Sequence, residues 1–234
     1  MSAGNIEIFD FGIADYEECL ALQTSKFESL VGSKKRGEAC GEAILIGEHY
    51  PVITLGRRAD AANILVSEDY LGKRGVALFK TGRGGDVTYH GPGQLILYPV
   101  IDLDKHRLGV KQYVDLLEET VIRLLEEYGI EAGRVAGATG VWLGTGGPAE
   151  RKICAIGVKC SHFCTMHGLA LNVNNSLDGF SLINPCGFID KGVTSIKNET
   201  GREPDMDEVK RKMLHIFLSL IFPFKEILHF PEKL

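Results

Sequence analysis

The sequence predicts an α+β fold in which helices flank a central sheet that is mixed and largely antiparallel. Segments with strand character cluster in the middle of the chain, and helical patterns lie outside them, without the regular βαβ alternation of a parallel sheet. The 234 residues, of which 44% are hydrophobic, can build one domain (1–234) with a substantial core. No repeat, linker or low-complexity segment divides them.

The helices are predicted from apolar residues that recur about every 3.6 positions and from capping residues. They cover residues 16–31, 67–74, 110–128 and about 205–220. Asp15 is positioned to cap the first helix, and the basic segment GSKKRG then ends it. Asp205 and Glu208 have capping-box spacing at the start of the last helix, and Pro223 stops it.

The strands are predicted from short apolar segments that are bounded by Gly, Pro and polar residues. Residues 42–56 contain two of them about a turn at His49–Pro51, and further strands cover residues 76–80, 95–100, 140–144, 151–161 and 166–174. The tract GTGGPAE, Gly144 to Glu150, is a turn signal. The strands on either side of this tract therefore form a predicted hairpin.

Charge and targeting signals exclude several classes of protein. The net charge of −5 argues against a nucleic-acid binder that relies on broad positive charge. No apolar run approaches the ~20 residues that span a bilayer, so no membrane partner is expected. The N-terminal residues resemble neither a secretory signal nor an arginine-rich transit peptide. A cytoplasmic location with free thiols is therefore expected.

Cysteine and histidine residues gather in one part of the sequence. The group comprises Cys154, Cys160, His162, Cys164 and His167. It lacks the short paired spacing of a zinc finger or ribbon, although alternation along one strand would place the first four on one side. Buried cysteine usually behaves as a small hydrophobic residue, so we expect no metal, and zinc binding remains a minor alternative.

Glycine is concentrated between residues 81 and 93, directly before a strand. This loop has no GKS or GKT ending, and GRGGDV is not GxGxxG and does not precede a helix, so it is not a nucleotide-binding loop. A second unusual turn, INPCGF, holds Cys186 between proline and glycine. Cys186 is either a half-buried structural thiol or a nucleophile that a neighbouring base activates. The available histidines and lysines are His90, His162, His167, Lys152, Lys159 and Lys191.

Three segments together resemble the octanoyltransferase family. They are GRGGDVTYHGPGQLILYPV, RKICAIGVKCSHFCTMHGLALNV and INPCGF, in the order found in that family, and the similarity covers roughly residues 5–220. The resemblance implies the fold of biotin and lipoate protein ligases. It also implies transfer of octanoyl from octanoyl-acyl carrier protein to a lysine of a lipoyl domain, the first step of endogenous protein lipoylation. The implied acceptors are 2-oxoacid dehydrogenase complexes and the glycine cleavage H protein.

The resemblance also implies roles for individual residues. Cys186 would be the nucleophile and thioester carrier, and Lys152 would lower its pKa and relay protons. No cofactor is implied. The residues expected to line the acyl and thioester site are Arg83, Gly84, Gly85, Asp86, Val87, Thr88, Tyr89, His90, Ala155, Ile156, Gly157, Gly168, Leu169 and Ala170. The glycine-rich loop would then form a tunnel wall and supply backbone N–H groups, and His90 would orient the site.

Other functions remain possible from the sequence. An ATP-dependent lipoate or biotin ligase would share the fold but need no cysteine, and a silent carrier-protein-binding module would need neither Lys152 nor Cys186. The implied partners are acidic, whereas the chain carries a net charge of −5. A local basic rim would resolve this conflict, because complementarity is local. The residues that could form it are Arg57, Arg58, Arg74, Lys80 and Arg83.

Overall fold

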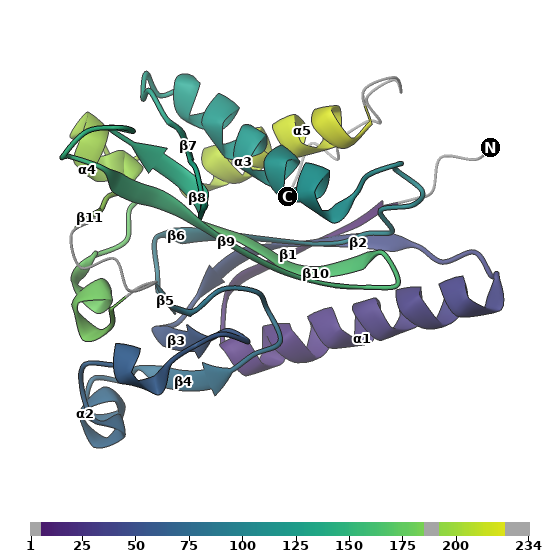
Figure 1. Cartoon of the computed structure of the whole chain (residues 1–234), viewed down its shortest axis with the longest axis horizontal. Helices are drawn as coiled ribbons and strands as arrows, with labels where there is room; N and C mark the ends of the chain where they lie inside the picture. The colour runs from purple at the N-terminus through teal and green to yellow at the C-terminus, as the bar shows by residue number, and fades with distance from the viewer. Residues whose placement is uncertain (1–5, 185–191, 223–234) are drawn as a thin grey trace.

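The computed structural model describes residues 6–184 and 192–222, which form one large sheet with helices on both faces and a smaller sheet beside it (Figure 1). The large sheet has the strand order β1-β2-β6-β10-β9-β8-β7, with β11 added beside β9. Its strands are β1 Ile6–Ala14, β2 Glu42–His49, β6 Gln94–Val100, β7 Gly133–Val135, β8 Ala138–Leu143, β9 Arg151–Ser161, β10 Cys164–Asn172 and β11 Gly192–Val193. Only the β1–β2 and β11–β9 pairs of this sheet are parallel. The predicted mixed, largely antiparallel sheet is confirmed.

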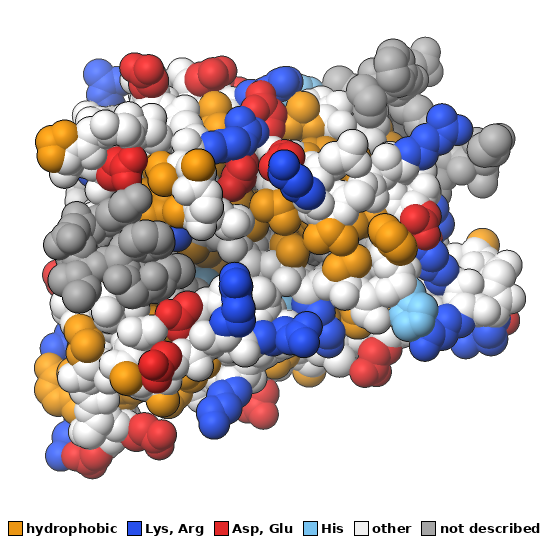
Figure 2. Space-filling model, viewed as in Figure 1, with side chains coloured by type: hydrophobic (Ala, Val, Ile, Leu, Met, Phe, Trp, Pro, Cys, Tyr) orange, Lys and Arg blue, Asp and Glu red, His pale blue; other side chains and the backbone are white. Residues whose placement is uncertain are grey.

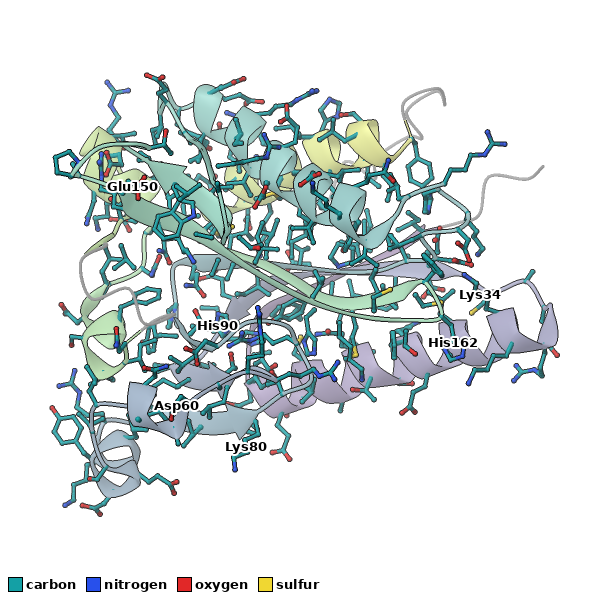
Figure 3. All side chains as sticks on the ribbon, viewed as in Figure 1. Lys34, Asp60, Lys80, His90, Glu150 and His162 are labelled. Atoms are coloured by element: carbon teal, nitrogen blue, oxygen red, sulfur yellow. The ribbon has the colours of Figure 1, made fainter. Side chains whose placement is uncertain are left out.

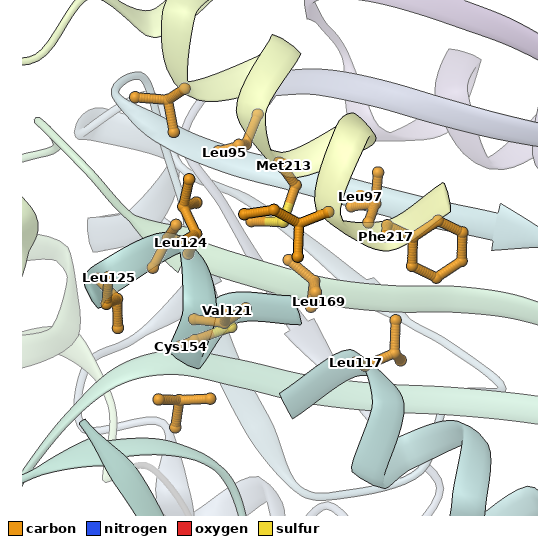
Figure 4. Close-up of a cluster of buried hydrophobic side chains, with 14 of the residues drawn as sticks. Leu95, Leu97, Leu117, Val121, Leu124, Leu125, Cys154, Leu169, Met213 and Phe217 are labelled. Atoms are coloured by element: carbon orange, nitrogen blue, oxygen red, sulfur yellow. The ribbon is translucent and has the colours of Figure 1, made fainter. Parts of the chain in front are cut away.

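Two helices cover one face of the large sheet. They are α3 (Val110–Glu126) and α5 (Met206–Ile221), which lie together above the sheet in Figure 1. Leu117 and Val121 of α3, with Met213 and Phe217 of α5, pack against alternate residues of the strands, such as Leu97 (Figure 4). Because side chains alternate along a strand, the intervening residues of the same strands point to the other face.

The opposite face is covered by α1 (Tyr16–Arg36), which runs beneath the sheet in Figure 1. Its residues Cys19, Phe27 and Leu30 pack against Ile96 and Tyr98 of β6. All seven residues of β6 are therefore buried, which explains why this strand reads as a continuous apolar run in the sequence.

A second sheet of three strands lies beside the N-terminal half of α1 (Figure 1). It has the order β4-β3-β5, formed by β3 Val52–Leu55, β4 Ala77–Lys80 and β5 Val87–His90. The short helix α2 (Glu68–Lys73) packs against β4, and Ser67 caps it by accepting from the Tyr70 N–H. The 3₁₀ turns Ala61–Asn63 and Asp178–Leu182 and the short helix α4 (Ile196–Thr200) complete the described elements.

Several helix ends differ from the prediction. The first helix continues to Arg36, because Gly37 at φ +71° provides the left-handed C-cap and the basic residues of the last turn favour the negative end of the helix dipole. Asp15 occupies the N-cap position, but its side chain makes no capping hydrogen bond. Asp205 caps α5 through the Asp207 N–H rather than through the predicted capping box.

The strands also depart from the prediction. β1, β7 and β11 are not among the predicted strands, and the second half of the glycine-rich segment forms β5. The strands on either side of His49–Pro51 exist, but β2 belongs to the large sheet and β3 to the small one. The tract Gly144–Glu150 does join a hairpin, since β8 pairs antiparallel with β9.

Candidate active site

A cavity of about 560 Å³ lies where the glycine-rich segment meets the middle of the large sheet. β9 and β10 pair with each other along one wall of this cavity, with Gly168 opposite Gly157 and Ala170 opposite Ala155. All six predicted residues of these two strands line the cavity: Ala155, Ile156, Gly157, Gly168, Leu169 and Ala170. The wall formed by these strands is therefore largely apolar or bare backbone.

The glycine-rich segment forms a second wall. Arg83, Gly84, Gly85, Asp86, Val87, Thr88 and His90 line the cavity. Tyr89 does not, because its ring points away from the cavity. That ring packs against Phe180 with 5.6 Å between ring centroids, and it leaves no room for a Cβ at Gly179.

Contacts within the protein explain why this segment needs glycine. Gly85 has φ +89°, a conformation that L side chains rarely adopt. The Gly84 N–H donates to the carbonyl oxygen of Val158 at 2.9 Å, and a Cβ at Gly157 would lie 2.8 Å from the Gly84 carbonyl oxygen. The loop is thus held tightly against β9, and the Gly84 N–H is already engaged with the protein rather than with a ligand.

Two charged residues of the loop have structural partners. Arg83 donates through Nη2 to the Thr54 carbonyl oxygen at 2.6 Å and through Nη1 to the Gly84 carbonyl oxygen at 3.0 Å. The Asp86 carboxylate accepts from Asn63 Nδ2 at 2.7 Å and from the Asp60 N–H at 3.2 Å. These bonds fasten the loop to β3 and to the segment after it, which fixes the cavity wall.

His90 is the last residue of β5 and so belongs to the small sheet (Figure 3). Its Nδ1 lies 2.7 Å from Gln94 Oε1 and therefore carries the hydrogen, which leaves Nε2 as an acceptor 3.4 Å from Thr54 Oγ1. Burial, with a smaller effect of nearby His49, lowers the pKa of His90 to about 3. His90 is therefore neutral at ordinary pH, with a defined tautomer.

Aromatic and histidine side chains that the sequence did not identify lie next to His90. Tyr16 and Tyr98 line the cavity, and His49 packs within 6.0 Å of the His90 ring. His49 Nδ1 lies 3.1 Å from the Ala14 carbonyl oxygen, which can only accept, so its Nε2 accepts from the Tyr98 hydroxyl. A single aromatic or histidine residue within an apolar segment cannot be recognised from the sequence as lining a cavity, because its partners lie on other strands.

Lys152 lines the cavity from β9. Its ammonium nitrogen lies 4.5 Å from the centre of the Trp142 ring, on the neighbouring strand β8. Its backbone carbonyl accepts from the Thr194 N–H at 2.9 Å, and Val193 of β11 pairs beside it and also lines the cavity. Cys186 lies outside the described residues, so its distance from Lys152 is not part of this geometry.

The cysteine and histidine group does not assemble as the sequence suggested. The chain turns at His162 and Phe163, so Cys160 and Cys164 lie on different strands. Cys154 packs in the cluster under α3 and α5, whereas Cys164 packs under α1, on the other face of the sheet. Within residues 6–184 and 192–222, no three His, Cys, Asp or Glu side chains are grouped to hold a metal ion.

None of the helices in the described part of the chain combines the length and apolarity that crossing a membrane would require.

The expected basic rim is only partly assembled. Arg58 and Arg83 line the cavity, and Arg57 and Lys80 are exposed. Arg74 instead lies at the end of α2, over the Tyr70 ring. Lys and Arg side chains also lie near the centre of the face shown in Figure 2.

Solved structures share this fold. A lipoate-protein ligase A bound with ATP superposes with a TM-score of 0.69 at 17% identity, covering 94% of this chain and 86% of that one. A biotin protein ligase from Aquifex aeolicus superposes with a TM-score of 0.51 at 16% identity, covering 96% and 72% of the two chains. The expected biotin/lipoate protein ligase-like fold is confirmed; at these identities the similarity concerns the fold alone.

Sequence relatives are much closer. The family model described as the lipoyl protein ligase A/B catalytic domain matches residues 15–218. The octanoyltransferase of Bacteroides thetaiotaomicron is 53% identical, over 88% of this chain and 91% of that protein. The octanoyltransferase of Flavobacterium johnsoniae is 46% identical, over 91% of this chain and 96% of that protein. The chain therefore belongs to the octanoyltransferase family, within the lipoyl protein ligase A/B catalytic-domain family.

Proposed function

We propose that the protein transfers an octanoyl group from octanoyl-acyl carrier protein to a lysine of a lipoyl domain, through a thioester on Cys186. The acceptors would be the 2-oxoacid dehydrogenase complexes and the glycine cleavage H protein, and the reaction would be the first step of endogenous lipoylation. The observation that supports this most directly is the cavity of about 560 Å³ that Lys152 and the glycine-rich segment border together, in a chain so similar to octanoyltransferases.

The proposed chemistry needs one thiolate and one group that moves a proton. The Cys186 thiolate attacks the donor carbonyl carbon, and the carrier-protein sulfur leaves with a proton from the Lys152 ammonium. The acceptor amine then attacks the new thioester and gives its proton to the Lys152 amine as the Cys186 thiolate leaves. Both catalytic groups return to their starting states, and an amide replaces the donor thioester.

The shape and lining of the cavity are compatible with an alkyl chain. Ligand cavities are usually about 300–1,000 Å³ and mostly apolar, with a few polar groups. Ala155 and Ala170 offer apolar surface on one side, while His90 and Arg83 are held by bonds to the protein on the other. We assign the octanoyl chain to the β9–β10 wall and the thioester end to the region of Lys152.

We propose that the whole chain, 1–234, forms one catalytic domain and works in the cytoplasm, where a nucleophilic thiol stays reduced. The match of the family model to residues 15–218 supports the first point. Arg57, Arg58 and Lys80 are the exposed cations that we assign to an acidic carrier protein or lipoyl domain.

An ATP-dependent ligase is the second candidate, because the fold is shared with lipoate-protein ligase A. The two reactions differ in their source of energy. A thioester donor is already activated, so we expect transfer from octanoyl-carrier protein to a lipoyl domain to proceed at the same rate with and without ATP and Mg²⁺. The product is measured by the mass of the lipoyl domain, with added chelator as the metal-free condition. Strict dependence on ATP would assign the protein to the ligase reaction instead.

A further inference from the structure

We propose that Trp142 and Gly140 of β8 are positioning residues that hold the Lys152 ammonium at the cavity and keep it protonated. The consequence for catalysis depends on the proposed role of Lys152, but the effect on Lys152 itself does not. The inference arises from three features of the β8–β9 pair: an indole ring beneath the ammonium, a glycine beside the lysine stem, and a buried carboxylate that fixes that glycine.

The indole is rigidly placed. Trp142 is 2% exposed, and its Nε1 donates to the Ala138 carbonyl oxygen at 2.8 Å. Trp142 stands directly opposite Lys152 in the strand register, so both side chains lie on the same face of the sheet. The Lys152 ammonium nitrogen lies 4.5 Å from the ring centre, within the range of a cation–π contact.

Gly140 lets β8 lie close to the backbone of β9, next to the lysine stem. The β8–β9 register shifts between Val141 and Trp142, and Gly140 has φ +124°. A Cβ at this position would lie 2.5 Å from the Cys154 carbonyl oxygen and 3.5 Å from Lys152 Cε. A side chain here would therefore force β8 away from β9 at the point where the lysine crosses the indole.

A buried carboxylate fixes Gly140. Glu118 of α3 is 6% exposed, and its Oε1 accepts from the Gly140 N–H at 3.0 Å. Its Oε2 accepts from Arg134 Nε at 3.0 Å. Buried carboxylates are costly unless paired, and this pairing ties β8, next to the register shift, to α3. The buried carboxylate therefore links the position of the β8 strand beside Lys152 to the core of the protein.

The indole also affects protonation. The electron-rich ring face attracts the ammonium and not the neutral amine, so the ring raises the pKa of Lys152 relative to the same site without it. Removing the ring lowers that pKa. In the proposed reaction the ammonium favours the Cys186 thiolate, so loss of the ring moves the alkaline limb of the pH–rate profile to lower pH.

The first test measures Lys152 directly, without activity. An amine-acylating reagent reacts with the neutral amine, and digestion followed by mass spectrometry reports labelling of each lysine as a function of pH. We expect the labelling midpoint of Lys152 to fall by roughly 0.4–1.5 pH units in Trp142→Leu, and by less in Trp142→Phe, which keeps a ring.

Phe27→Leu is the matched control. Phe27 is also a buried ring, and it lies 5.0 Å from the ammonium nitrogen of Lys159 on the same strand, β9. This variant should shift the midpoint of Lys159 and leave that of Lys152 unchanged. An unchanged Lys152 midpoint in a folded Trp142→Leu protein would overturn the inference, as would an equal shift in Phe27→Leu.

A second measurement needs no change at Trp142. Trp142 is the only tryptophan of the chain, so its fluorescence reports on the ring next to Lys152. The wild-type emission should show an alkaline transition that is absent in Lys152→Met. If both Trp142 variants fail to fold, this fluorescence titration tests the inference in their place. The absence of the alkaline transition in the wild type would overturn the inference. Undiminished transfer by Lys152→Met would contradict the proposed proton relay and leave the labelling result standing.

Discussion

Burial holds three histidines neutral: His90 and His167, which line the cavity, and His49, which packs against His90. Desolvation is the largest cause in each case, and it lowers the pKa of His49 to about 4 and those of His90 and His167 to about 3. The nearby guanidinium of Arg83 acts in the same direction on His90 and His167. None of the three is therefore suited to act as a charged acid near neutral pH, which is consistent with an orienting role for His90.

These shifts make stability depend on pH. Below about pH 6.5 the unfolded chain binds a proton at each of these histidines, while the folded chain does not until about pH 3–4. Stability is therefore lost as the pH falls through this window, by up to about 1.4 kcal/mol per pH unit for each histidine. Denaturant unfolding measured from pH 7 to pH 4.5 should show this slope.

His49→Phe keeps a ring against its aromatic neighbours and removes one titrating group. We expect the slope of the free energy of unfolding against pH to decrease by about one proton in this variant, or about 1.4 kcal/mol per pH unit. If His49→Phe had the wild-type slope, the acid sensitivity would have another origin.

At the residue scale, the sequence located parts of the site and missed others. Arg83 and His90 were identifiable because they belong to a dense glycine-rich segment. Tyr16, His49 and Trp142 were not, because each is a single aromatic or histidine residue whose partners lie on other strands. The family resemblance implied Tyr89 as a lining residue, but in the structure its ring packs against Phe180 and does not line the cavity.

The β9–β10 hairpin is the element that organises the site, and its turn is strained. His162 lies at the end of this hairpin farthest from Glu150 (Figure 3). The two turn residues, His162 and Phe163, have φ of +52° and +59°, as in a type I′ turn, which favours Asn-Gly. Left-handed backbone costs residues with a Cβ roughly 1–2 kcal/mol each.

The double variant His162→Asn, Phe163→Gly should therefore be more stable than the wild type by about 1 kcal/mol, net of lost contacts. A thermal melt should show a midpoint roughly 2–4 °C higher. Phe163→Ala retains the unfavourable backbone and loses the aromatic ring, so as the matched control it should not be stabilised. A double variant that melts at or below the wild-type temperature would show that the ring contacts outweigh the strain.

Some predicted ends of helices and strands match the structure because glycine, proline or capping residues mark them in the sequence. β9 matches its predicted range of 151–161, because a glycine and proline tract precedes it and the His162–Phe163 turn follows. The end of α1 was missed because Ser33 to Arg36 have no apolar pattern, and the glycine cap after them decides where the helix stops. β1 was missed because it is an edge strand with a mixed exposure pattern, and its position depends on pairing with β2.

At the scale of the whole molecule, the site depends on segments that are distant in the chain. The glycine-rich loop reaches β9 through the Gly84–Val158 bond, and Lys152 is set by β8, α3 and β11. The segments that resemble a family predict that these residues lie together, but they do not predict which backbone groups form the hydrogen bonds between them. The expected loop N–H donors illustrate this, since the Gly84 N–H is bound to Val158.

The central claim is that octanoyl passes through a thioester on Cys186, and intact-mass spectrometry tests it most directly. The protein is mixed with octanoyl-carrier protein, its mass is recorded, and a lipoyl domain is then added. We expect the wild type to gain the mass of one octanoyl group, hydroxylamine to remove it, and the lipoyl domain to take it up. Cys186→Ala should gain nothing and transfer nothing. Transfer by Cys186→Ala at a rate comparable to the wild type, with no acylated enzyme in either protein, would contradict the account.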